Sequence, residues 1–189
     1  LFDEGHYEPA ISWSETIRNF SCPRIIFSAT PFRNDLKAFD IDWEYHYFKS
    51  YSDLAQKNFI RNVDFIEKQG IVEPEEKIKD ILNTLNQLRK GTANAKAIIN
   101  CENSASILVI SKILHDSRIP FIAIHENFTK EFRDSKKNKV VDYLRKSVPK
   151  QPEEIEADVW IHQYKLLEGI DYHYFQMVAI YEPLRNFRS

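Results

Sequence analysis

KAIINCENSASILVISKILHDSRIPFIAIH, residues 96–125, contains the pattern from which the fold class of this chain is predicted. Residues 96–101 form a short apolar run, residues 104–116 an apolar segment of helix length, and residues 121–125 a second apolar run. Short apolar runs of this kind are typical of strands that are buried on both faces, and parallel strands need a crossover such as a helix between them. The segment therefore predicts a β-α-β unit.

The same alternation continues outward from this segment. Pro74, followed by Glu75 and Glu76, starts a predicted helix that ends at Lys90-Gly91, where the acidic residues suit the positive end of the helix dipole. Strands are also predicted at 24–28, 63–66, 158–163 and 176–181, a basic amphipathic helix at 137–147, and an aromatic stretch with one packed face at 39–51. Strands that alternate with helices predict an α/β fold with a parallel sheet covered on both faces.

Composition restricts the class of protein further. The 189 residues are 43% hydrophobic and 29% charged, which indicates a globular chain of one large or two small domains. The net charge of −2 argues against a general electrostatic attraction to nucleic acid, although a local track of phosphate contacts stays open. No apolar run has the length of a membrane span, and Cys22 and Cys101 have no metal-ligand spacing, so we expect a cytoplasmic protein without a membrane partner.

Two strand ends carry residues suited to phosphate chemistry. Asp3-Glu4-Gly5-His6 follows an apolar pair, and adjacent carboxylates at a strand end can divide two tasks, holding Mg²⁺ and polarising an attacking water. Ser28-Ala29-Thr30 ends the strand predicted at 24–28, where small hydroxyl side chains can hydrogen-bond to a neighbouring carboxylate. Taken separately, a solvated acidic turn and a simple strand stop are alternative interpretations of these two segments.

Taken together, the two segments resemble known motifs. DEGH at 3–6 and SAT at 28–30 are similar to motifs II and III of superfamily 2 helicases, the DEAD/DEAH-box group of nucleic-acid-dependent ATPases. AIINC at 97–101 resembles the start of motif IV, and YKLLEGID at 164–171 resembles motif V. SATPFR and LLEGID look most like the motor subunits of restriction enzymes and related helicases of bacterial defence and repair.

The resemblance implies a division of the chain and a set of ligands. Residues 1–50 would be the C-terminal part of a first RecA-like, ATP-binding lobe, residues 51–72 a crossing segment, and residues 73–189 a truncated second RecA-like lobe. Each lobe would be a parallel sheet flanked by helices. The implied cofactors are ATP and Mg²⁺, and the implied partner is DNA, with RNA left open, together with partner subunits or fused domains of a restriction or repair system.

The resemblance also implies roles for the residues of motifs II and III. Asp3 would coordinate the Mg²⁺ that accompanies ATP, and Glu4 would activate the attacking water. His6 would couple the nucleotide site to motif III or to the other lobe. Ser28 and Thr30 would link hydrolysis to movement along the strand.

In the motif V segment, Gly169 would let the backbone approach nucleotide or nucleic acid, and Asp171 would accept a hydrogen bond from the ribose or from an arginine. Two parts of the family pattern have no counterpart in the 189 residues: the P-loop of motif I and the arginine finger of motif VI. Gly5 also differs from the commoner DEAD and DEAH spellings. We therefore expect an internal or truncated fragment that does not hydrolyse ATP alone.

Two other functions are compatible with the sequence. A non-catalytic relative could keep the helicase fold as a nucleic-acid-binding module. Alternatively, Asp158 with Gln163 and Lys165 imitates the metal-binding core of restriction nucleases, in which acid and amide hold the metal and lysine aids the attack.

Overall fold

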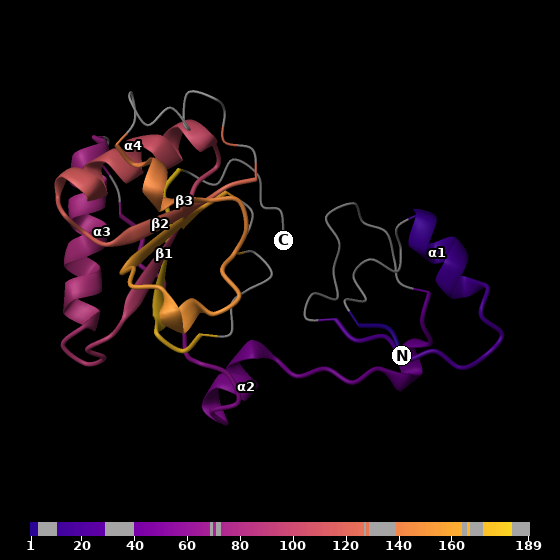
Figure 1. Cartoon of the computed structure of the whole chain (residues 1–189). Helices are drawn as coiled ribbons and strands as arrows, with labels where there is room; N and C mark the ends of the chain where they lie inside the picture. Colours follow the sequence, from indigo (N-terminus) through magenta and orange to yellow (C-terminus); the bar gives the residue numbers. More distant parts are fainter. Residues whose placement is uncertain are drawn as a thin grey trace. The chain divides into compact units, whose positions relative to one another are not determined.

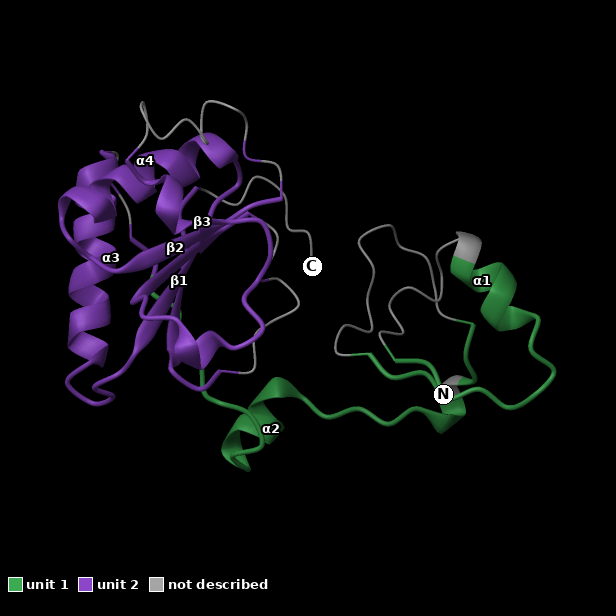
Figure 2. Cartoon of the chain, in the orientation of Figure 1, with its two compact units in different colours: residues 1–66, 185–189 green, residues 67–184 purple. Residues whose placement is uncertain are grey.

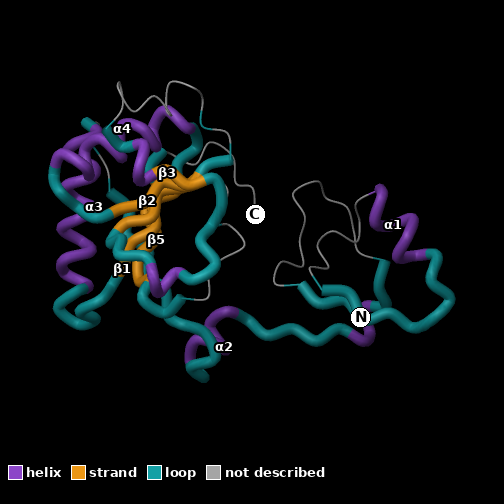
Figure 3. Tube along the Cα trace, viewed as in Figure 1, coloured by secondary structure: helices purple, strands orange, loops and turns teal. Residues whose placement is uncertain are grey.

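The computed structural model describes residues 1–3, 11–28, 40–68, 70, 73–126, 128, 139–163, 166 and 172–182. Residues 1–66 belong to one compact unit and residues 67–184 to a second (Figure 2). The helices and strands of the described part are shown in Figures 1 and 3. In chain order they are α1 (Ile11–Arg18), η2 (Trp43–Tyr45), α2 (Tyr51–Gln56), α3 (Pro74–Leu88), β1 (Lys96–Asn100), α4 (Ser104–Asp116), β2 (Phe121–Ile124), η3 (Val141–Tyr143), β3 (Leu144–Arg145), η4 (Pro152–Glu154), β4 (Val159–His162) and β5 (Phe175–Ile180).

The second unit is built on a five-stranded sheet with the strand order β3-β2-β4-β1-β5. All four strand pairs are parallel. β1, α4 and β2 form the β-α-β unit predicted from residues 96–125, and β4 and β5 lie within a residue of their predicted positions. The α/β class is therefore confirmed.

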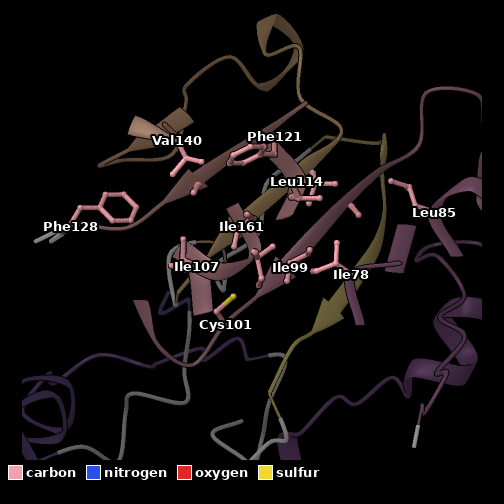
Figure 4. Close-up of a cluster of buried hydrophobic side chains, with 14 of the residues drawn as sticks. Ile78, Leu85, Ile99, Cys101, Ile107, Leu114, Phe121, Phe128, Val140 and Ile161 are labelled. Carbon is pink, nitrogen blue, oxygen red and sulfur yellow. The ribbon is translucent and has the colours of Figure 1, made fainter. Parts of the chain in front are cut away.

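Side chains alternate between two buried layers along the central strands. Ile99 of β1 and Ile161 of β4 pack with Ile78 of α3 and Ile110 of α4, and Figure 4 shows much of this layer as sticks. The neighbouring residues Ile98, Ile122 and Trp160 point to the opposite face and form a second cluster with Phe175. A central strand with apolar residues on both faces explains why β1, β2 and β4 have continuous apolar sequences.

The two layers have different covers within the described part. α3 and α4 supply the cover of the first layer, since Leu85, Ile107 and Leu114 are all fully buried there. On the second face, the partly buried cover comes from Val148, Ile155 and Tyr172 rather than from a described helix. Among the described residues, no helix has the length and apolar character needed to cross a membrane.

The first unit contains little regular structure. Phe2 and Ile26 form an isolated parallel bridge. Arg24, two residues before Ile26, ties this segment to its surroundings. Its guanidinium donates to the backbone oxygen of Ile17 at the end of α1 and forms an ion pair with Asp40 at 3.3 Å. Ser50 caps α2 by accepting a hydrogen bond from the Asp53 backbone.

The helix predicted at 137–147 is wrong for its described part. Residues 141–143 form the single turn η3, and Leu144 and Arg145 pair with Ala123 and Ile124 as the edge strand β3. The Tyr143 ring stacks on Phe121 with centroids 4.6 Å apart. Pairing with β2 and stacking on the core therefore outweigh the helical spacing of the apolar residues.

Two expectations for the first unit are also wrong. The segment 63–66 is not a strand: no ladder partner is found among the described residues, and Phe65 is 93% exposed. In the aromatic stretch at 39–51, the described residues form η2 and extended chain, and Tyr45, Tyr47 and Phe48 are all exposed instead of packed. Apolar side chains alone do not make a strand, because a strand also needs a neighbour for its backbone hydrogen bonds.

Candidate functional site

Asp3 and Ser28 lie at the ends of two adjacent parallel segments. The Phe2 backbone N–H donates to the Ile25 oxygen at 2.8 Å, and the Phe27 N–H donates to the Phe2 oxygen at 2.8 Å. Asp3 is the first residue after the bridge on one segment, and Ser28 is the second residue after it on the other. The chain thus brings the starts of the two predicted motifs to the same edge of the same pair of segments, which is where ligands meet parallel sheets.

The other predicted site residues lie outside the described part of the chain. These are Glu4, His6, Thr30, Gly169 and Asp171. The structure therefore places Asp3 and Ser28 on adjacent segments, and the roles assigned to all seven residues stay predictions.

The second unit has a topological switch point between β1 and β4. The chain leaves β1 toward β2, on the far side of β4, whereas it leaves β4 toward β5, on the far side of β1. Two neighbouring parallel strands whose connections diverge in this way open a crevice at their carboxyl ends, the usual place for a ligand. Gln163, the residue before the segment predicted to be motif V, directly follows β4 at this switch point.

Gln163 links three loops at the carboxyl ends of the strands. Its side-chain oxygen lies 2.7 Å from Nε2 of His125, which follows β2, and its side-chain nitrogen donates to the backbone oxygen of Glu102, which follows β1. Since an amide oxygen can only accept, His125 is the donor in the first bond. One side chain at the start of the 164–171 loop thus holds the ends of β1, β2 and β4 together.

Glu182 adds a second link from the end of β5. Its carboxylate accepts hydrogen bonds from the Glu102 backbone N–H at 2.9 Å and from the Asn103 side chain at 3.2 Å. Asn103 in turn caps α4 by accepting a hydrogen bond from the Ser106 backbone N–H at 2.9 Å. The loop after β1 is therefore hydrogen-bonded to Gln163, which follows β4, and to Glu182, which follows β5.

His162, the last residue of β4, is a neutral buried histidine. It is 2% exposed, and burial lowers its pKa to about 4. Its Nδ1 accepts a hydrogen bond from the Leu166 backbone N–H at 3.3 Å, so the ring proton of the neutral form is on Nε2. This hydrogen bond links the last residue of β4 to Leu166.

Cys101 follows β1 but does not have the character of a nucleophile. The thiol is buried, and burial together with the Glu182 carboxylate raises its pKa. A thiol that stays protonated is a poor nucleophile and metal ligand. Cys101 therefore contributes packing beneath the edge.

The alternative nuclease core is not assembled. Asp158 precedes β4 and Gln163 follows it, so the two lie at opposite ends of the strand, about 16 Å apart at a rise of roughly 3.3 Å per residue. The Asp158 carboxylate is 2.6 Å from the Arg89 guanidinium. Asp158 and Gln163 therefore cannot hold one metal ion together, and Lys165 lies outside the described residues.

Asp3 is the described carboxylate next to the Phe2–Ile26 bridge, where the ligand expected from the sequence is Mg²⁺ bound to a nucleotide. In such sites magnesium takes one or two carboxylates and receives its other ligands from phosphates and water, so Asp3 suits this role. Within the described ranges, no three His, Cys, Asp or Glu side chains form a metal-binding group.

Sequence reasoning missed Gln163, His125, His162 and Glu182 as members of one cluster. Their only shared sequence signal is position, because each lies at the carboxyl end of a strand or directly after one. Comparison of the chain with protein-family models and with curated proteins found no match.

The first prediction concerns Gln163. Gln163→Leu should lower the free energy of unfolding by about 1–3 kcal/mol, because it removes one hydrogen bond to His125 and one to the Glu102 carbonyl. Gln87→Leu, on the exposed surface of α3, is the matched control and should change stability by less than about 0.5 kcal/mol. Urea unfolding of both variants measures the difference, and equal stabilities would contradict the linking role of Gln163.

The second prediction concerns pH. The pKa of His162 is about 4 in the folded chain and about 6.5 in the unfolded chain, so its stabilising contribution is present above pH 6.5 and is lost as the pH falls toward 4. Between pH 7.5 and 5 the chain should lose roughly 2 kcal/mol more than a His162→Gln variant. The control is His173→Gln, on the exposed His173, which should keep the wild-type dependence, and parallel curves for wild type and His162→Gln would contradict the assignment.

Proposed function

We propose that this chain is part of an ATP-dependent helicase or translocase that moves on nucleic acid. The observation that carries the proposal is the parallel bridge between Phe2 and Ile26, which aligns the strand ends at Asp3 and Ser28. If the DEGH and SAT segments were unrelated turns, nothing would require them to follow neighbouring parallel segments.

The second unit supports the same proposal independently. The segment that resembles motif V follows β4, the middle strand of a five-stranded parallel sheet, and the segment that resembles motif IV overlaps the neighbouring strand β1. Both are positions where a RecA-like second lobe presents residues to nucleotide and nucleic acid. The RecA-like assignment itself is part of the proposal.

In the proposed mechanism, Asp3 would hold the Mg²⁺ that accompanies ATP, and Glu4 would accept a proton from the attacking water. The bound Mg²⁺ would supply neutralisation of the charge that develops on the phosphates. His6, Ser28 and Thr30 pass the change at the nucleotide to the rest of the lobe.

Gly169 and Asp171 belong to the loop that would respond in the second lobe. Opening and closing of two lobes around a nucleotide is an established way to convert hydrolysis into movement. The links from Gln163 and His162 hold the base of the 164–171 loop, so a displacement of that loop would be transmitted to the ends of three strands. The proposed setting is a cytoplasmic restriction or repair system that acts on DNA.

The test is ATP hydrolysis by the full-length protein. Hydrolysis stimulated by single-stranded DNA should fall by roughly 10²–10⁴-fold in Glu4→Gln, because the variant lacks the general base. Asp3→Asn should lose activity and also require more Mg²⁺. RNA in place of DNA identifies the nucleic acid.

Glu15→Gln, on the exposed side of α1, is the matched control and should retain full activity. Stimulated turnover that survives Glu4→Gln would reject the assigned base. A wild-type protein that binds DNA but never hydrolyses ATP would instead be the non-catalytic binding module.

A further inference from the structure

A cavity of about 340 Å³ lies at the amino ends of β1 and β4, whereas Gln163 lies at the carboxyl end of β4. Lys96 begins β1, and Asp158 directly precedes β4. The described residues that line the cavity are Arg89, Ala93, Asn94, Lys96, Asp158, Tyr172 and Tyr174. This position separates the cavity from Gln163 at the carboxyl ends of the strands, and the cavity volume is within the range of small-molecule sites.

The charges around the cavity leave one cation without a counter-ion. Asp158 is matched by Arg89, whose guanidinium lies 2.6 Å away and also donates to the Ala95 oxygen at 2.9 Å. The Lys96 ammonium donates to the Ile155 oxygen at 2.8 Å, and no described carboxylate lies within ion-pair distance of it. The side chains of Arg89, Lys96 and Asp158 therefore give the cavity a net positive charge.

The surroundings of Lys96 hold its charge at a cost. Burial lowers the pKa of Lys96; of the two neighbouring charges, Asp158 raises this pKa and Arg89, with a smaller effect, lowers it. An anion in the cavity would add a further favourable interaction with the Lys96 ammonium. Lysine commonly supplies this interaction to phosphate groups as a point charge.

An aromatic wall stands beside this cation. The Lys96 ammonium lies 5.6 Å from the centre of the Tyr172 ring. Tyr172 in turn contacts Tyr174 edge to face at 5.4 Å and Phe175 edge to face at 5.5 Å. Because Phe175 is buried in the core, the wall is fixed in place and offers an apolar surface next to the charge.

We propose that this cavity binds a nucleotide unit, with Lys96 holding the phosphate and the Tyr172–Tyr174 wall contacting the sugar or base. A phosphate group would complement the net positive charge of the cavity. The tyrosine side chains would contact the apolar parts of the same ligand. A free mononucleotide and a nucleotide within a single strand share this chemistry. The proposal does not depend on ATP hydrolysis.

The experiment titrates the 189-residue chain with inorganic phosphate, dTMP and a dT oligonucleotide. Isothermal calorimetry measures the dissociation constants, and NMR shifts of the backbone amides locate the site. We expect dTMP to bind more tightly than phosphate, with shifts centred on Lys96, Tyr172 and Tyr174. Tighter binding of the oligonucleotide than of dTMP identifies a strand as the source, and the reverse order identifies a free nucleotide.

Variants test the two parts of the cavity separately. Lys96→Met keeps the aliphatic stem and should weaken dTMP binding by about 10-fold or more, since hydrogen bonds to charged groups are stronger than those between neutral groups. Lys96→Arg restores the charge and should recover part of the affinity. Tyr174→Leu should weaken dTMP binding more than phosphate binding.

Lys90→Met is the matched control, because Lys90 is exposed just after α3 and near the same edge. It should leave dTMP binding unchanged. The proposal is overturned if dTMP does not bind the wild-type chain at millimolar concentration. It is also overturned if Lys90→Met and Lys96→Met weaken binding equally, since that result would indicate a general attraction to basic surface.

Discussion

The parallel pairing of β1 with β4 is the constraint on which the arrangement of the second unit depends. It aligns Ala97 with Val159 and Asn100 with His162, and it places the two strands in the middle of the sheet. Because each strand is buried on both faces, slipping the register by one residue would expose residues of both apolar layers. The same pairing sets Cys101 and Gln163 side by side at the carboxyl edge, and Lys96 and Asp158 near each other at the amino edge. The two ends of these strands thus carry different side chains. Hydrogen-bonding side chains and carboxylates lie at the carboxyl ends, and a cation and tyrosines lie at the amino ends.

The sheet could be predicted largely from sequence because its strands carry the strongest local signal. Residues 97–99 and 121–124 are apolar throughout, and burial on both faces accommodates such runs. The errors occurred where the structure depends on a partner that is distant in sequence. Leu144 and Arg145 become a strand because β2 offers a free edge, and residues 63–66 do not become one because no described strand pairs with them. The spacing of apolar residues in the sequence does not show whether a segment will find a strand to pair with.

The candidate sites divide in the same way. Asp3 and Ser28 could be selected beforehand because their residue types suit phosphate chemistry and each follows an apolar run. The cluster around Gln163 could not, since glutamine and histidine are common surface residues and only the strand order brings them together. Lys96 was equally hidden, because its unmatched charge follows from the pairing of Asp158 with Arg89. Residue type indicates which chemistry a side chain can perform, and the strand order determines which side chains lie close enough to act together.

The central claim is that Asp3 faces a nucleotide-bound metal ion at the edge it shares with Ser28. The most direct measurement is a crystal structure of the full-length protein with Mn²⁺ and a non-hydrolysable ATP analogue, using the anomalous signal of the metal. The account predicts one metal between the analogue's phosphates and the Asp3 carboxylate, either in contact at about 2.1 Å or through one ordered water. A bound analogue whose metal and phosphates lie away from Asp3 and Ser28 would contradict it.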